Sequence, residues 1–380
     1  METRTLLRDF QSHNQSRSVY TVESGLVVKA NKIRLLDFNI YTDSGYQNLV
    51  SQFALHPLAG VYSLIKKISF LNLEGQEIDS MTNCINNMSL RLLHMDNGTQ
   101  EGVSSVINCT SNSFFNKDSK SIIASQYENS LSATNGLYID LASMLNYLNT
   151  REYIAEGFTI IIEWESQAAW APQYPVASLG NLYISSPTLA IDEALEVSSA
   201  QVSTQPVMFT NMINDKVYIG TSTDMKITRL NSFYNQFISN LYYLNTHKTA
   251  QYSGLGFSKS EKEVFELTID GKKLLPLRGV DTPARKLAYL HDFTGSCNIV
   301  SGSYTPLANP LNIEMKGLNS PTIMFNNIMS YGCIKLDRFI QNDLTLTYSR
   351  TLTDDVDLTV IAEVLKMYDP KSGQLTYVKQ

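Results

Sequence analysis

The sequence contains the same β-strand patterns twice, about 190 residues apart, and this duplication constrains the fold more than any other feature. The segment LNLEGQEI at 71–78 matches LTIDGKKL at 267–274, and aligning Gly75 with Gly271 gives an offset of 271 − 75 = 196. The segment GLYIDL at 136–141 matches GCIKL at 332–336 at the same offset. In both copies of the first pattern an acidic residue and a glycine separate two apolar runs, which predicts a strand, a turn and a second strand.

A third pair of segments indicates which face of the expected sheet is buried. REYIAEGFTIIIEWES at 151–166 matches DRFIQNDLTLTYSRT at 337–351 once the extra residues 142–150 are set aside. The apolar side chains alternate along both copies, and such alternation places one face of an antiparallel sheet on a core and the other partly toward solvent. The predicted core-facing positions are Phe158, Ile160, Ile162 and Trp164 in the first copy and Leu344, Leu346 and Tyr348 in the second.

The repeat unit has the size of a whole domain, whereas the units of solenoids and propellers are about 20–50 residues long. Only 17% of the residues are charged and 43% are hydrophobic, which favours short strands with polar loops over long charged helices. An immunoglobulin-like sandwich of about 100 residues would leave too much of each copy unexplained. We therefore predict an all-β fold of two tandem eight-stranded antiparallel jelly rolls, a double jelly roll, with short helices in the connections.

The expected division of the chain is an N-terminal arm at 1–20, a first jelly roll at 21–200 and a second jelly roll at 201–380. DLASMLNYLNT predicts a short helix capped by Asp140, and TPARKLAYLHDF predicts a helix over 282–293 that begins at Thr282 and Pro283. The polar tracts at 96–135 and about 295–330 predict long loops, which are usually functional at such lengths.

The N-terminal arm combines three apolar residues with arginines. Leu6, Leu7 and Phe10 lie close to Arg4 and Arg8, and this spacing allows one or two turns of an amphipathic helix. A flexible terminus is the alternative interpretation of the same residues.

Charge and cysteine content exclude several classes of protein. A net charge of −6 and a pI near 5.5 argue against a general or sequence-specific nucleic-acid binder, which normally carries a large basic surface. No run approaches the roughly 20 apolar residues of a membrane span, and no secretion signal is recognisable. The four cysteines are scattered without metal-ligand spacing, and we expect free thiols in a reducing compartment. They are Cys84, Cys109, Cys297 and Cys333.

No motif for catalysis, metal binding or cofactor binding is present in the sequence. Glu163 and Glu165 lie on one face of the strand predicted at 158–166, as in a glycosidase pair, but the matching segment has no acid at Ser349. The histidines His94 and His291 occupy equivalent positions in the repeat, which favours a structural role. We therefore expect neither an enzyme nor a bound cofactor or metal.

The tandem arrangement resembles the double jelly-roll major capsid proteins of tailless icosahedral double-stranded DNA viruses, in the lineage of Polinton-like viruses, virophages and tectiviruses. The resemblance covers residues 20–380 and depends on the joint order of its segments, none of which is specific alone. They are YISSPTLAIDEAL after the first copy, LTIDGKKLLPLRG, and KLDRFIQNDLTLTYSRT.

This resemblance implies a major capsid protein located in the virion capsid and assembled in the interior of the host cell. Its implied partners are itself, as a homotrimer forming pseudo-hexagonal capsomers, then neighbouring capsomers and minor capsid or penton proteins. N-terminal segments of this family often lie inside the shell against a membrane or a scaffold protein. Assembly or interior contacts are therefore expected at Arg4, Leu6, Leu7, Arg8 and Phe10.

The alternative is a secreted or surface protein that binds or hydrolyses carbohydrate on a pair of jelly rolls. Such a protein usually carries a secretion signal, and either exposed tryptophans or an acidic pair. This chain has two tryptophans, Trp164 and Trp170. A minor capsid or penton protein is a nearer alternative, but those proteins generally contain one roll.

Overall fold

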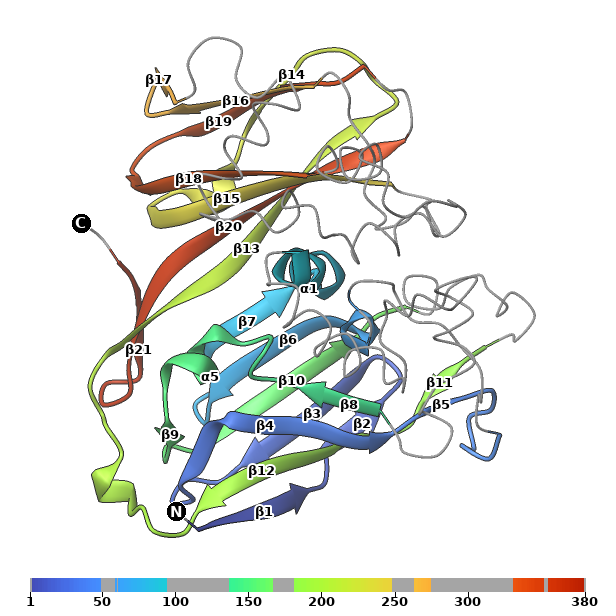
Figure 1. Ribbon diagram of the computed structural model, residues 1–380, viewed down its shortest axis with the longest axis vertical. Helices are drawn as coiled ribbons and strands as arrows, with labels where there is room; N and C mark the ends of the chain where they lie inside the picture. Colours follow the sequence, from blue (N-terminus) through green and yellow to red (C-terminus); the bar gives the residue numbers. More distant parts are fainter. Residues whose placement is uncertain are drawn as a thin grey trace, which may run out of the picture. The chain divides into compact units, whose positions relative to one another are not determined.

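The computed structural model describes residues 2–48, 59, 61–93, 137–166, 181–247, 263–274, 331–351 and 355–378 (Figure 1). The chain divides into two compact units. The first comprises Met1–Leu92, Gly98–Asn211 and Lys366–Thr376, and the second comprises Leu93–Asn97, Met212–Leu365 and Tyr377–Gln380. In both units the described residues form mainly antiparallel strands (Figure 1).

The first unit contains two five-stranded sheets. One sheet has the order β1 (Thr3–Arg8), β12 (Thr188–Ala194), β4 (Val28–Phe38) and β8 (Leu137–Asp140), with β9 (Tyr153–Ile154) also paired to β4. The other has the order β2 (Ser12–Asn14), β3 (Arg17–Val22), β10 (Phe158–Trp164), β6 (Ile65–Asn72) and β7 (Glu77–Thr82). A two-stranded ladder joins β5 (Ile40–Tyr41) to β11 (Tyr183–Ile184).

The second unit is built from a five-stranded and a four-stranded sheet. The first has the order β13 (Val207–Gly220), β20 (Val356–Asp369), β15 (Gln236–His247) and β18 (Tyr331–Ile340), with β21 (Gln374–Tyr377) also paired to β20. The second has the order β14 (Lys226–Arg229), β19 (Leu344–Ser349), β16 (Val264–Ile269) and β17 (Lys272–Lys273). Residues 207–211 of β13 and 366–369 of β20 belong to the first unit.

The two strand orders correspond strand for strand. The sequence β1-β12-β4-β8 in the first roll becomes β13-β20-β15-β18 in the second, and β3-β10-β6-β7 becomes β14-β19-β16-β17. Along the chain these strands appear in the same succession in both halves. Each half is therefore an eight-stranded jelly roll of two antiparallel sheets, to which shorter strands are added, and the predicted double jelly roll is confirmed.

The repeated strand at the centre of each roll faces the core as predicted. Phe158, Ile160, Ile162 and Trp164 of β10 are buried, and the residues between them are half-buried. The matching core positions of β19 are buried as well. These are Leu344, Leu346 and Tyr348.

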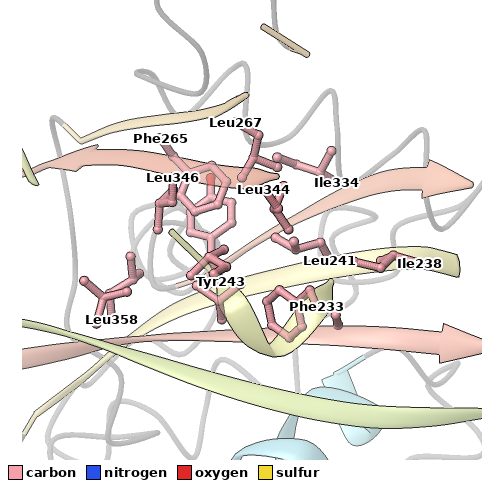
Figure 2. Packing of buried hydrophobic residues seen from close by; sticks show 14 of the residues in the cluster. Phe233, Ile238, Leu241, Tyr243, Phe265, Leu267, Ile334, Leu344, Leu346 and Leu358 are labelled. Atoms are coloured by element: carbon pink, nitrogen blue, oxygen red, sulfur yellow. The ribbon is translucent and has the colours of Figure 1, made fainter. Parts of the chain in front are cut away.

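Aromatic side chains pack at the centre of both cores. In the first roll the ring of Phe158 stacks on Phe70 of β6 at a centroid distance of 4.9 Å. In the second roll the ring of Tyr243 stacks on Phe265 at 3.7 Å, among the apolar residues shown in Figure 2. Phe70 and Phe265 therefore lie on equivalent strands, β6 and β16, whereas their stacking partners come from β10 and β15, which are not equivalent.

The two predicted hairpins are present, but their turns differ. In the second roll Asp270 and Gly271 both have positive φ angles, 49° and 77°, between the paired residues Ile269 and Lys272. This is the geometry of a two-residue type I′ turn, which an Asp-Gly sequence favours. In the first roll only Gly75 of the turn has a positive φ, 87°, and the loop is longer.

The helices among the described residues are short. They are α1 (Cys84–Leu93) and α5 (Asn146–Thr150), with 3₁₀ turns η1 (Val61–Leu64), η3 (Ser199–Gln201) and η4 (Asn231–Phe233). The prediction that Asp140 caps a helix was wrong. Asp140 ends β8, and its Oδ1 accepts a hydrogen bond from the backbone N of Ala142 at 3.1 Å, so the helix α5 starts only at Asn146. Buried Leu137 and Ile139 hold this segment in the sheet.

The helical interpretation of the N-terminal arm was also wrong. Residues Thr3–Arg8 form β1, which pairs along its whole length with β12, from Thr3 opposite Ala194 to Arg8 opposite Leu189. As a strand, residues 3–8 form backbone hydrogen bonds with the edge of β12. A helix of one or two turns would have no such partner and would be only marginally stable in water. The helix predicted at 282–293 and the loops predicted at 96–135 and about 295–330 lie outside the described residues.

Candidate assembly surface

Most of the exposed large apolar side chains among the described residues lie in or beside the first strands of each roll. The strands β1 and β13 end one sheet of their roll, and β3 and β14 lie at or next to the end of the other. Burial of apolar surface stabilises a fold by about 25 cal/mol per Å², so these side chains contribute little to their own core. Six of the ten lie in residues 3–22 and 207–229, namely Leu7, Phe10, Met208, Tyr218, Met225 and Ile227.

The structure places the five arm residues that the sequence singled out along or just after β1. They are Arg4, Leu6, Leu7 and Arg8 in the strand and Phe10 after it. The guanidinium of Arg4 lies 2.6 Å from Glu193 on β12, which fixes the register of this edge. Leu7 is 59% exposed and Phe10 is 40% exposed, with its ring 5.6 Å from that of His13. Their role as assembly contacts stays a prediction.

The second roll exposes three larger apolar side chains that the sequence analysis missed. Tyr218 of β13, Met225 just before β14 and Ile227 of β14 are 66%, 60% and 70% exposed. Ile227 lies opposite Thr347, and the neighbours of Thr347 on β19 point into the core, so Ile227 is on the outer face of its sheet. The sequence signal for Ile227 was its position in the alternation of KITR, which can be assigned to the outer face only once β19 is known to be the partner.

The two rolls differ at the end of the sheet that contains β3 in the first roll and β14 in the second. In the first roll β2 pairs with β3, from Ser12 opposite Val19 to Asn14 opposite Arg17. In the second roll β14 is the last strand of its sheet, and within the described ranges only β19 pairs with it. An uncovered edge strand presents backbone donors and acceptors that another strand can bind.

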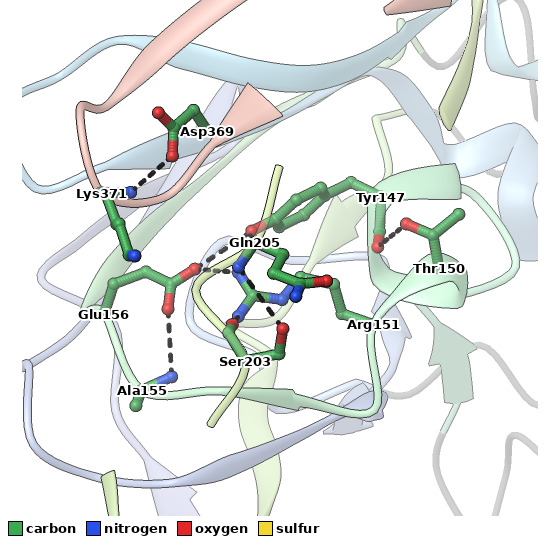
Figure 3. A network of polar contacts seen from close by, with 9 residues as sticks. All are labelled: Tyr147, Thr150, Arg151, Ala155, Glu156, Ser203, Gln205, Asp369 and Lys371. Atoms are coloured by element: carbon green, nitrogen blue, oxygen red, sulfur yellow. Dashed lines mark hydrogen bonds and ion pairs between the residues drawn. The ribbon is translucent and has the colours of Figure 1, made fainter. Parts of the chain in front are cut away.

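A buried arginine connects three segments of the first unit (Figure 3). The guanidinium of Arg151 forms an ion pair with Glu156, donates to the hydroxyl oxygen of Tyr147 at 2.8 Å, and donates to the carbonyl of Ser203 at 2.8 Å. Burial raises the pKa of the Tyr147 hydroxyl, and the carboxylate of Glu156 acts in the same direction. The tyrosine is therefore a neutral hydrogen-bonding group, and the cluster serves to hold the segments together.

A second buried cluster surrounds Asp79 of β7 in the same unit. Its carboxylate accepts hydrogen bonds from the backbone N of Ser80 at 2.8 Å, the backbone N of Tyr147 at 2.9 Å and the side-chain amide of Asn211 at 2.6 Å. Burial raises the pKa of Asp79, while these donors and the ammonium of Lys366 oppose the rise. Burial also lowers the pKa of Lys366, against the attraction of Asp79.

This second cluster anchors a late segment of the chain in the first unit. Residues 366–376, which hold the end of β20 and most of β21, belong to that unit. The ring of Tyr368 lies edge-on to that of Tyr147 at 5.6 Å, and Asp369 accepts a hydrogen bond from the backbone N of Lys371 at 3.0 Å at the turn (Figure 3). The first unit thus includes the end of β20, the last core strand of the second roll, and most of β21 after it.

The candidate chemical residues do not converge on a reactive site within the described part of the chain. Glu163 lies opposite Arg17 and Lys67 on the neighbouring strands, on the face turned away from the core. Cys84 and Cys333 are buried free thiols whose pKa is raised by burial, so both are poorly reactive. His94, His291, Cys109 and Cys297 lie outside the described residues.

The described residues contain no group of three or more His, Cys, Asp or Glu side chains arranged to hold a metal ion. No helix among them is long and apolar enough to cross a membrane.

The fold is similar to those of viral major capsid proteins of known structure. The mavirus major capsid protein matches with a TM-score of 0.57 at 10% identity, covering 98% of this chain and 89% of that protein. A chain of the Sputnik virophage matches with a TM-score of 0.57 at 10% identity, covering 100% and 89%. A chain of the PBCV-1 virus capsid matches with a TM-score of 0.56 at 8% identity, covering 100% and 97%. No protein-family model matches the sequence, and no curated protein is similar to it in sequence.

Proposed function

We propose that this chain is a major capsid protein, a structural subunit that forms the shell of an icosahedral virus. The observation that carries the proposal is the strand-for-strand correspondence of two jelly rolls in one chain, matched over nearly its full length by capsid proteins of mavirus and PBCV-1. Because the sequences are only 8–10% identical, the comparison depends on the shared fold.

Duplication of a roll has a direct consequence for symmetry. Three chains related by a threefold axis bring together six similar rolls, so a homotrimer approximates sixfold packing. Such a capsomer can contact six neighbours in a near-equivalent way, which a subunit with one roll cannot do as a trimer. The proposed capsomer is therefore pseudo-hexagonal, and capsomers tile the shell.

The partners proposed for this subunit are its own copies, neighbouring capsomers, and minor capsid or penton proteins at the vertices. Its proposed location is the virion capsid, assembled in the interior of the host cell, and its proposed role requires no catalysis. The boundary between the two rolls is proposed near residue 200, after β12 and before β13. The residues around β1 are proposed as contacts with an internal membrane, a scaffold protein or adjacent capsomers.

The carbohydrate alternative gains no support from the described tryptophan. Trp164 is 4% exposed, and its indole Nε1 donates a hydrogen bond to Ser18 at 2.8 Å. A sugar-stacking platform requires an exposed aromatic face, whereas this ring packs inside the first roll 6.0 Å from Phe38.

The test is the mass and shape of the purified protein. Light scattering after size exclusion should give about 128 kDa (3 × 42.6 kDa), and negative-stain images should show particles with pseudo-hexagonal outlines. A monomer at every concentration up to the millimolar range would overturn the proposal. Turnover or specific binding of a glycan by that monomer would instead support the alternative.

A further inference from the structure

We propose that the side chains of Tyr41, Tyr46 and Tyr183, at one end of the first roll, form a binding site for a neutral saccharide. We call these three residues the tyrosine patch. The inference goes beyond the proposed capsid function, because it concerns a ligand of the single chain and not the assembly of subunits. It depends on the grouping of the rings, the fixed conformation of the loop that carries Tyr46, and the charge of the surrounding segments.

The first observation is that the three side chains lie together on an outward face. β5 and β11 form a two-stranded ladder in which Tyr41 lies directly opposite Tyr183 (Figure 1). The other pair of this ladder, Ile40 and Ile184, is buried. Because successive residues of a strand point to opposite faces, the two tyrosines point away from the core. The ring of Tyr46 lies 5.5 Å from that of Tyr41 at an angle of 68°, so these two rings form a corner.

The second observation is the fixed conformation of the loop after β5, which carries Tyr46. The carboxylate of Asp43 accepts hydrogen bonds from three backbone N–H groups of this loop, at 3.0, 3.1 and 2.7 Å. The donors are Gly45, Gln47 and Asn48. These hydrogen bonds lower the pKa of Asp43, so the carboxylate is charged at neutral pH and holds the loop closed.

The backbone of Tyr46 itself has a conformation that is rare for a bulky residue. Its φ is 55°, in the left-handed region. The side-chain amide of Gln15 donates to the Tyr46 hydroxyl at 2.9 Å and also binds the backbone of Ile184, through the carbonyl at 2.9 Å and the N–H at 2.8 Å. Residues held in such conformations by their surroundings cluster at ligand sites. Because the loop is already ordered, a ligand does not bear the cost of ordering it.

The exposed area of the tyrosine patch suits a small ligand. Tyr46 is 36% exposed, and Tyr41 and Tyr183 are partly exposed. With roughly 200 Å² for each tyrosine, the three side chains together offer at most about 200 Å² of accessible surface. A stable protein partner needs about 600–800 Å² on each side. The patch alone therefore suits a sugar better than a protein.

The third observation is the charge of the segments that form the patch. Residues 12–16, 39–48 and 181–187 contain no lysine or arginine, and their one acidic residue is Asp43, which binds the loop backbone. Residues 44–48 are all exposed and uncharged. Phosphate groups, nucleic acids and anionic lipid headgroups are held mainly by basic side chains. A neutral ligand rich in hydroxyl groups is therefore the class that this environment favours.

The chemistry of a sugar fits the arrangement of the rings. One face of a pyranose carries C–H bonds, which pack against the electron-rich face of an aromatic ring. The sugar hydroxyls exchange hydrogen bonds with phenol and amide groups such as those of Tyr183 and Gln47. In the corner between Tyr41 and Tyr46, one ring supports the face of the sugar and the other contacts its edge. The site binds its ligand without making or breaking a covalent bond.

The test is the binding of neutral sugars to the full-length protein, measured by saturation-transfer difference NMR. The probes are the methyl glycosides of glucose, galactose, mannose, N-acetylglucosamine and fucose, with glucose 6-phosphate as the anionic control. We expect at least one neutral glycoside to bind with a Kd in the millimolar range, as its small size dictates, and glucose 6-phosphate to bind no more tightly. If none of the neutral glycosides receives saturation at tens of millimolar, or if only the phosphate binds, the inference is overturned.

Three variants locate the bound sugar. Tyr46→Asn removes the ring while tolerating a positive φ, and should raise the Kd at least about tenfold. Tyr46→Phe keeps the ring and should raise the Kd less than about threefold. The matched control is Tyr377→Asn on β21, because Tyr377 is 41% exposed and lies outside the patch. Its Kd should stay within about twofold of wild type.

Circular dichroism and thermal unfolding confirm that the three variants fold. An unchanged Kd in Tyr46→Asn, or an equal loss of binding in Tyr377→Asn, overturns the inference. The failures of this inference and of the capsid proposal can be told apart. If the wild-type protein assembles but binds no neutral glycoside, this inference is overturned and the capsid proposal stands. If it binds a glycoside through Tyr46 but stays monomeric at all concentrations, this inference stands and the capsid proposal is overturned.

Discussion

The first roll pairs β3 with an additional strand, β2, whereas in the second roll the equivalent strand β14 pairs only with β19 among the described residues. The strand order of the two rolls is otherwise the same. A feature that both rolls share can be a requirement of the jelly-roll fold, whereas a feature of only one roll is not required for folding. The covered edge of the first roll and the edge strand β14 of the second are such a difference.

The first prediction, and the largest expected effect, concerns the equivalent core positions Phe158 and Leu344. Both side chains are buried at the start of the same strand in their rolls. Truncation to alanine should destabilise by about 3–5 kcal/mol for Phe158→Ala and about 2–5 kcal/mol for Leu344→Ala, because transfer and cavity costs add. Denaturant unfolding followed by tryptophan fluorescence, which reports on the first roll through Trp164, measures the loss.

This pair also tests whether the rolls unfold separately. If each roll is an independent cooperative unit, Leu344→Ala should leave the transition reported by Trp164 in place. A shift of that transition equal to the shift produced by Phe158→Ala would show that the rolls unfold together.

The second prediction concerns the Asp79 cluster of the first unit. Asp79→Ala would leave the amide of Asn211 and the backbone N of Tyr147 without this acceptor, and would remove the carboxylate that favours charged Lys366. Leaving buried polar partners and a buried charge uncompensated costs about 3–5 kcal/mol. Thermal unfolding measures this cost, and an unchanged melting temperature would contradict the anchoring role.

The pH dependence of the same residue has a definite sign. Since the pKa of Asp79 in the folded protein lies above its usual value of 3.8, the folded chain binds this proton more tightly than the unfolded chain. Its contribution to stability is therefore fully present below pH 3.8 and is lost as the pH rises through the folded-state pKa. The free energy of unfolding of wild type minus that of Asp79→Asn should fall over that range. A rise would show that the hydrogen bonds and Lys366 outweigh burial.

The third prediction uses the two turn glycines, Gly75 and Gly271. Both have positive φ angles, and a Cβ at either position would meet no atom within 4 Å. Substitution by alanine should therefore cost only backbone strain, about 1–2 kcal/mol at each site. Asparagine tolerates this conformation better, so Gly271→Asn should recover part of the loss. A larger loss at one site, measured by urea unfolding, would mean that its turn fixes the register of the hairpin.

The fourth prediction, with the smallest effect, concerns an ion pair that both hairpins contain with the charges exchanged. In the first roll Lys67 of β6 lies 2.9 Å from Glu77 of β7, and in the second roll Lys273 of β17 lies 2.8 Å from Glu266 of β16. Exposed pairs of this kind contribute about 0.2–1 kcal/mol. Exchanging both residues of one pair should therefore change stability by less than about 0.5 kcal/mol at 0.15 M salt. A larger change would show that the neighbouring Ser69, which donates to Glu77, fixes the polarity of the pair.

The central strands and hairpins were predictable because their signal is local. The alternation from Phe158 to Trp164 has a period of two, and the glycines Gly75 and Gly271 mark turns whatever surrounds them. The arm was mispredicted for the opposite reason. Leu6 and Leu7 are adjacent, so they fit a helix as well as a strand, and only the partner β12, some 185 residues away, decides between the two.

For a related reason, the sequence indicated the exposed apolar residues of the first roll but not those of the second. Leu7 and Phe10 stand out in a polar arm, whereas Ile227 is an ordinary strand residue until its pairing with Thr347 shows that it faces outward. The Asp79 cluster likewise joins residues from four distant segments, and no spacing in the sequence brings Asp79, Tyr147, Asn211 and Lys366 together.

The assignment of residues 366–376 to the first unit has a consequence for the order in which the protein can fold during synthesis. Domains usually fold as they leave the ribosome, beginning with the N-terminal one. Here the partners of Asp79 and Tyr147 include Lys366 and Tyr368, which lie near the end of β20, the last of the eight core strands of the second roll. These contacts of the first unit can therefore form only after nearly all of the second roll has been translated, although the eight strands of the first roll are made much earlier.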